Sequence, residues 1–82
     1  MKLKLDQAEL GRVKLNNLVR MHRARLDITQ DDLAQAIGVS RQTIHAIERG
    51  KAEPSVALAL KIAAYFEIRV DELFMLKADE TA

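Results

Sequence analysis

The chain has 82 residues, of which 49% are apolar, so it can bury one small core but is too short for two domains. It contains no Cys, which excludes disulfides and thiolate metal sites. Its formal net charge is only +1, yet residues 1–25 hold seven Lys or Arg against two acids, so any basic surface must be local.

Several function classes are disfavoured as well. Only His22 and His45 could supply imidazole, and no carboxylate cluster flanks either of them in sequence, so we expect no metal and no other cofactor. The chain has no nucleophile–base pair and no phosphate-binding loop, which argues against an enzyme. No apolar run reaches the length of a membrane span or a signal-peptide core, so we expect a soluble, cytoplasmic protein.

Residues 1–14 carry the weakest pattern. Leu3 and Leu5 alternate with charged residues, which is typical of an extended strand, and Gly11 interrupts any helix that follows. We therefore interpret this segment as an N-terminal arm or a short strand.

A helical pattern begins near residue 15. Asn16 and Asn17 are both suited to cap this helix, and Asp27 lies at its end. Side chains that would face a core repeat along one side of it: Leu15, Leu18, Val19, His22 and Leu26.

Residues 29–50 contain two short helix patterns separated by a tight turn. Thr29 is suited to cap the first helix, with Asp32 where a capping box carries an acid, and Ser40 is suited to cap the second. Gly38 lies between them, where a positive φ costs glycine nothing and lets the chain reverse. This arrangement predicts a helix-turn-helix.

The second helix of this pair has two different faces. Ile44 and Ile47 lie on the side that would face a core, and Gly50 suits the position just beyond the helix end. On the opposite side, four polar residues cluster within about one quadrant: Arg41, Gln42, His45 and Arg49. Arg and Gln hydrogen-bond well to base edges, so this face indicates the DNA major groove as its partner.

The following segment supplies the centre of the core. Pro54 and Ser55 end one element and cap the next. Residues 56–66 are too apolar for a surface helix, so they predict the central helix of the domain.

The C-terminal segment begins with a last short helix at residues 71–74. Met75 and Leu76 continue the apolar pattern beyond this helix. Residues 77–82 are mostly polar, and we expect them to be a frayed tail.

The pattern as a whole resembles the lambda-repressor-like, or Xre/Cro, family of helix-turn-helix transcriptional regulators. The resemblance runs from about residue 16 to residue 74 and rests on Thr29-Gln30, Leu33-Ala34, Gly38-Val39-Ser40, Ile44, Ile47-Glu48 and Gly50. It implies an all-α, compact five-helix domain over residues 15–76 that binds double-stranded DNA as a two-fold dimer. Residues 1–14 lie outside it, so a flexible arm, a DNA-contacting tail and a strand that pairs with a partner chain all stay open.

The resemblance also gives expected roles to single residues. Gln30 is expected to clamp a phosphate, Arg41 and Gln42 to contact bases, and Lys51 to contact a phosphate. The expected DNA-binding residues are Gln30, Ser40, Arg41, Gln42, Thr43, His45, Arg49 and Lys51. The alternative is that they are ordinary solvated or capping residues.

Two further pairs of residues depend on the resemblance. Arg23 and Glu48 are charged residues on otherwise packed helices, and they are expected to pair across the core; the alternative is two independent surface charges. Asp27 and Glu67 stand where the family commonly has Gly, or in the second case Gly or Asn, so each is expected to have a positive φ.

These features together predict a sequence-specific transcriptional repressor that acts as a homodimer on a pseudo-palindromic operator. Phe74, Met75 and Leu76 exceed what a five-helix core needs, which predicts a dimer interface there, with the N-terminal strand as an optional part. The alternative is that Leu76 covers the protomer's own core. Two other functions stay open: an antitoxin-type regulator that also neutralises a partner protein, and a protein-interaction module.

Overall fold

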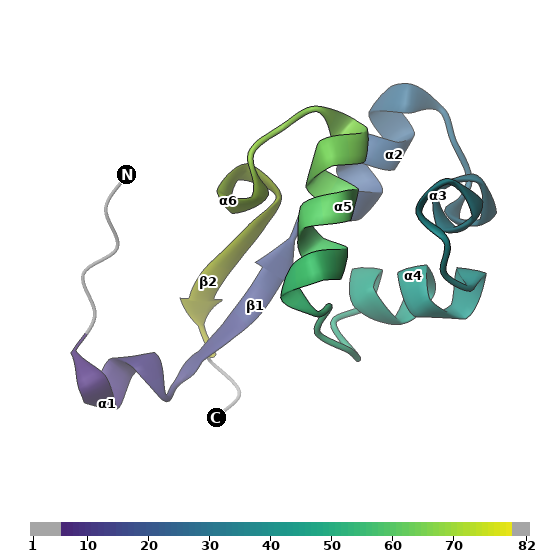
Figure 1. The fold of residues 1–82 in the computed structure, drawn as a ribbon. Coiled ribbons are helices and arrows are strands. Elements are labelled where there is room, and N and C mark those ends of the chain that lie inside the picture. Colours follow the sequence, from purple (N-terminus) through teal and green to yellow (C-terminus); the bar gives the residue numbers. More distant parts are fainter. Residues whose placement is uncertain (1–5, 80–82) are drawn as a thin grey trace.

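The structure, a computed structural model, describes residues 6–79 of the chain. Its elements are α1 (Gln7–Leu10), β1 (Val13–Asn17), α2 (Val19–Leu26), α3 (Gln30–Ile37), α4 (Arg41–Glu48), α5 (Val56–Phe66), α6 (Val70–Leu73) and β2 (Phe74–Ala78). In Figure 1, α5 occupies the middle of the molecule, with α3 and α4 toward one side and α6 with the two strands toward the other. The helices α3 and α4 are the predicted helix-turn-helix.

β1 and β2 form a two-stranded antiparallel sheet that joins the two ends of the helical unit. The residues paired across it are Val13 with Ala78, Lys14 with Lys77, Leu15 with Leu76, Asn16 with Met75 and Asn17 with Phe74. One further backbone bond extends the pairing, since the Asp79 amide donates to the Arg12 carbonyl at 2.9 Å. The sheet therefore ties the beginning of the helical unit to its end.

This sheet corrects the all-α fold class. The five expected helices are present as α2 to α6, and α1 and the two strands are additional. Leu15 lies in β1 and not on the first helix, and the last helix ends at Leu73, so Phe74 begins β2. A five-residue strand is stable only with a partner, and the two partners here lie at opposite ends of the chain, where a local pattern cannot connect them.

The segments on either side of the helical unit are described in part. The described part of residues 1–14 forms α1, which begins after its cap Asp6 and ends before Gly11, and then enters β1. Leu3 and Leu5 lie outside the described residues. The expected frayed tail is wrong for residues 77–79, because they belong to β2 or bond to Arg12.

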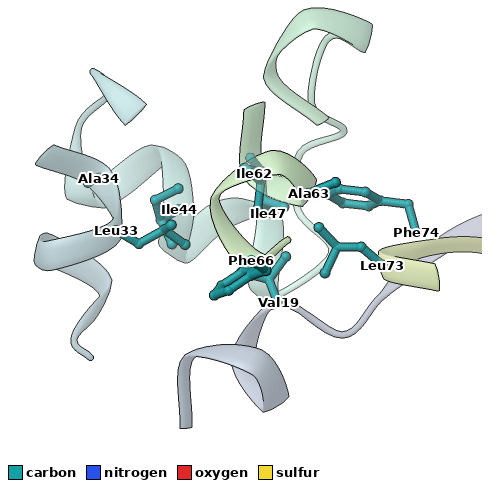
Figure 2. Close-up of a cluster of buried hydrophobic side chains, with 10 residues drawn as sticks. All are labelled: Val19, Leu33, Ala34, Ile44, Ile47, Ile62, Ala63, Phe66, Leu73 and Phe74. Carbon is teal, nitrogen blue, oxygen red and sulfur yellow. The ribbon is translucent and has the colours of Figure 1, made fainter. Parts of the chain in front are cut away.

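The core gathers around α5, as the apolar composition of residues 56–66 predicts. Figure 2 shows its ten side chains, which are Val19, Leu33, Ala34, Ile44, Ile47, Ile62, Ala63, Phe66, Leu73 and Phe74. The helix-turn-helix contributes Leu33 and Ala34 from α3 and Ile44 and Ile47 from α4. Ala34 is 1% exposed, and its small side chain lets α3 and α4 approach closely.

Two helices end in a left-handed residue that is not glycine. Asp27 after α2 has φ 55° and Glu67 after α5 has φ 58°, which confirms the predicted positive φ at both positions. Each is followed by an amide that bonds back into the helix: the Ile28 amide donates to the Arg23 carbonyl, and the Ile68 amide donates to Ala63, both at 3.1 Å. These closing bonds keep an unfavourable backbone conformation in place.

Glycine at these positions should therefore be tolerated or stabilising. Relief of the left-handed conformation is worth about 1 kcal/mol and opposes an entropic loss of about 0.5–1 kcal/mol, so Glu67→Gly should lie between neutral and slightly stabilising. Asp27→Gly should be closer to neutral because Asp accepts this conformation better. Denaturant midpoints measure both, with Ala64→Gly inside α5 as a control that should lose about 1 kcal/mol. A loss of more than about 1 kcal/mol of unfolding free energy in both Asp27→Gly and Glu67→Gly would show that these residues are not strained.

An ion pair joins α2 to the last turn of α4. Arg23 Nε donates to Glu48 Oε2 at 2.6 Å and Nη2 donates to Oε1 at 3.0 Å, while Nη1 donates to the Ile28 carbonyl at 2.9 Å. The two side chains are 15% and 4% exposed, so this is the buried pair that the resemblance implies. Within the described residues, no buried side-chain nitrogen or oxygen lacks a hydrogen-bond partner. The pair therefore fixes α4 without stranding a polar atom.

The pair also determines the ionisation of Glu48. Burial opposes the charged form, but the hydrogen bonds from Arg23 and Gln30, together with the charges of Arg23 and Arg20, outweigh it and lower the pKa of Glu48. The hydrogen bond to Glu48 in turn raises the pKa of Arg23, which stays charged at every usable pH.

Removing one member should be far more damaging than breaking an exposed pair. Arg23→Leu strands a buried carboxylate and should cost about 3–5 kcal/mol of unfolding free energy. The control is Arg69→Leu, whose partner Asp71 is 64% exposed, and it should cost no more than about 1 kcal/mol. Chemical denaturation of both variants measures the difference. Equal losses in the two would show that burial of the Arg23 pair contributes nothing.

Acid should weaken the fold partly through Glu48. Because its folded pKa lies below the ordinary value of 4.5, its contribution is complete above that pH and is lost as the pH falls through the lower, folded value. Glu48→Gln should therefore be less stable at pH 7 and show a flatter loss of stability below pH 4.5. Denaturation series across this range compare the slopes, and parallel slopes would contradict the assignment.

Candidate nucleic-acid interface

The helix-turn-helix is built by local caps. The Asp32 amide donates to Thr29 Oγ1 at 3.0 Å, and the Thr29 amide donates back to the Asp32 carboxylate at 2.9 Å, so the capping box is confirmed. These bonds to Thr29 lower the pKa of Asp32. Gly38 has φ 80° in the turn, and Ser40 Oγ accepts from the Thr43 amide at 3.1 Å to begin α4.

The apolar and the polar residues of α4 lie on opposite faces of the helix, as predicted. Ile44 and Ile47 are 0% and 2% exposed and lie in the core. Every residue of the predicted polar quadrant is exposed, namely Arg41, Gln42, His45 and Arg49. Because the apolar face anchors the helix, these four side chains point away from the body and are available to a partner.

Gln30 connects the start of α3 to this polar face. Its Nε2 donates to Glu48 Oε1 at 3.1 Å and lies 3.4 Å from His45 Nδ1. Gln30 and Arg41 also line the same open hollow of about 470 Å³ at the start of α3. As the first residue of α3, Gln30 has a backbone amide with no partner inside the helix. The structure thus brings Gln30, Arg41 and His45 together.

The remaining expected residues are placed differently. Ser40 and Thr43 are capping residues first, and their hydroxyl oxygens lie 2.9 Å apart and share a hydrogen bond. Lys51 is exposed and follows Gly50, whose φ is 72°; the Lys51 amide donates to the Ala46 carbonyl at 2.8 Å. Arg49 and Lys51 therefore flank the C-terminal end of α4.

Two residues near α4 are not among the expected DNA-binding residues. Asn17 caps α2, as anticipated for Asn16 or Asn17, because its Oδ1 accepts from the Val19 amide at 3.1 Å. Its Nδ2 also donates to the Ile47 carbonyl at 3.0 Å, a contact that only tertiary structure reveals. Arg20 is exposed on α2, and its charge contributes to lowering the pKa of Glu48. The excess of basic residues before residue 26 is the one sequence signal that includes Arg20.

No group of three or more His, Cys, Asp or Glu side chains within residues 6–79 is arranged to hold a metal ion. Nor does any helix in that range combine the length and the apolar character needed to cross a bilayer.

The chain is similar in sequence to small regulators. An uncharacterised HTH-type transcriptional regulator of Methanocaldococcus jannaschii is 47% identical over 66 residues, which is 80% of this chain and all of that protein. The uncharacterised HTH-type transcriptional regulator YgzD of Bacillus subtilis is 40% identical over 65 residues, covering 79% of this chain and 98% of that protein.

Two further comparisons agree with the fold. The crystal structure of a candidate DNA-binding protein from Bacteroides fragilis superimposes with a TM-score of 0.68 and covers 74% of this chain and 98% of that one, at 24% identity. The model of the helix-turn-helix family matches residues 19–73, which span α2 to α6. The chain therefore belongs to the helix-turn-helix family of the Xre or lambda-repressor-like type, together with these HTH-type transcriptional regulators.

Proposed function

We propose that this chain is a sequence-specific DNA-binding transcriptional repressor that acts as a homodimer on a pseudo-palindromic operator. The observation that carries the proposal is the exposed polar quadrant of α4, which stands opposite the buried Ile44 and Ile47. A helix anchored in this way can enter the major groove with its polar side chains facing the base edges.

We assign the base contacts to the first turn of α4. Arg41 can bind guanine with two hydrogen bonds, and Gln42 can do the same with adenine. His45 lies one turn further on, with Nδ1 near Gln30, so its Nε2 side is free to face a base or a phosphate.

Phosphate contacts surround this helix. Gln30 offers the amide group at the start of α3, where a helix favours anions, and the Glu48 carboxylate already orients its side chain. Arg49 and Lys51 supply positive charge at the far end of α4. Ser40 and Thr43 combine their capping role with hydroxyls that can donate to the DNA backbone.

The dimer part of the proposal rests on the hairpin and α6. Phe74 is 8% exposed and belongs to the protomer's own core, so it is withdrawn from the proposed interface. Leu76 is 41% exposed, and with Met75 it lines an open groove of about 710 Å³. Arg69, Asp71 and Glu72 line the same groove with both signs of charge, which suits a surface that meets its own copy across a two-fold axis.

Base contacts and phosphate contacts should respond differently to mutation. Arg41→Ala or Gln42→Ala should cost about 1–3 kcal/mol per half-site and relax the base preference at one position. Lys51→Ala should weaken all sequences alike and reduce the salt dependence, whereas Lys61→Ala on α5 is the matched control and should change neither. Selection from random DNA and titrations at two salt concentrations provide the readout. An Arg41/Gln42 double variant that selects the same operator with unchanged affinity would refute the assignment.

Self-association should depend on Leu76. In the proposed dimer Leu76 is buried, so a charge at this position would lose its hydration when the dimer forms. Leu76→Asp should therefore shift the protein toward monomer and weaken operator binding. Leu60→Asp is the control, because Leu60 is 52% exposed on α5 and lies outside the groove. Sedimentation at micromolar concentration measures both variants. A wild type that stays monomeric when free and when bound to its operator would rule out this interface.

A further inference from the structure

Asn17 is the last residue of β1, and its side chain connects three elements. Its Oδ1 accepts from the Val19 amide in the first turn of α2 at 3.1 Å, and its Nδ2 donates to the Ile47 carbonyl in the last turn of α4 at 3.0 Å. Its own backbone is paired with Phe74 in the sheet. The amide therefore lies between the hairpin, α2 and the helix whose polar face is proposed to read DNA.

The Ile47 carbonyl lies where α4 ends. It also accepts the Gly50 amide at 3.0 Å, so two donors converge on this one oxygen at the point where the chain turns. Arg49 and Lys51, the proposed phosphate contacts, flank this turn. A donor that fixes the Ile47 carbonyl thus fixes the backbone from which both basic side chains project.

A second polar contact holds the adjacent residue of α4. Glu48 is bound by Arg23, and Arg23, like Asn17, belongs to the segment formed by β1 and α2. Two contacts to consecutive residues restrain both the position and the rotation of the helix end.

We propose that Asn17 is a positioning residue for DNA recognition, acting through the Ile47 carbonyl to set the orientation of the C-terminal half of α4. The inference rests on the proposed function. The chemistry requires an amide, because one end of the side chain must accept from Val19 and the other must donate to Ile47. A carboxylate of the same shape would keep the first bond and place an acceptor against the carbonyl.

Asn17→Asp makes this change, and Asn16→Asp is the matched control. The two residues are neighbours in β1, both half-buried, and both line the hollow of about 250 Å³ between β1 and the end of α4. Asn16 makes neither of the two bonds that Asn17 makes to Val19 and Ile47, and it has no role in the proposed DNA-contacting set. The same charge is added at almost the same place, so general repulsion of DNA affects both variants alike.

The expected result is a specific loss in N17D. At pH 7.5, under conditions where circular dichroism shows both variants folded, N17D should bind the selected operator at least about tenfold more weakly than N16D, with a smaller preference over random DNA. Lowering the pH to about 5 partly protonates the introduced carboxyl, which can then donate to Ile47 again, so the gap between the variants should narrow. A purely structural role would not produce this pH-dependent recovery.

Each other outcome has a definite meaning. Equal operator affinity in N17D and N16D, or a gap that does not change with pH, overturns the inference. If N17D does not fold, Asn17→Ser decides: serine keeps the cap on Val19 but is too short to reach Ile47, and operator affinity equal to N16D overturns the inference. If the wild type and N16D select no DNA sequence at all, the proposed function itself fails and this inference fails with it.

Discussion

The position of α4 depends on the buried carboxylate of Glu48. Its side chain is 4% exposed, and a charge in that environment is tolerated only when partners satisfy its oxygens. Arg23 supplies two hydrogen bonds from α2, and Gln30 supplies a third from α3. Helices α2, α3 and α4 have eight residues each, too few to be stable alone, so this shared charge together with the core determines how the three are arranged.

The same carboxylate links stability to recognition. Gln30, a proposed phosphate contact, is half-buried and oriented by Glu48, while His45 on the polar face lies beside it. A residue oriented before the ligand arrives loses less conformational freedom on binding, so an interface that is held in place in the free protein binds more tightly. The ion pair therefore affects both the folded state and the geometry of the surface that is proposed to meet DNA.

Features encoded within a few residues could be predicted, and those that need distant partners could not. The caps at Thr29 and Ser40 and the turn at Gly38 each depend on groups three or four positions apart, which a sequence displays directly. The Arg23–Glu48 pair depends on how the helices cross, so its prediction came from the family resemblance and not from local sequence. The sheet and the Asn17 contact to Ile47 were missed, because they join β1 to segments that no local period connects to it.

The pairing of β1 with β2 closes almost the entire helical unit into one loop. Loop-closure entropy grows with the separation of the paired residues, so these strands gain little by meeting before the helices between them have formed. The two strands then pair late in folding and separate early in unfolding. Opening of the strands would draw Asn17 away from the Ile47 carbonyl, so the pairing of β1 with β2 and the order at the end of α4 are coupled.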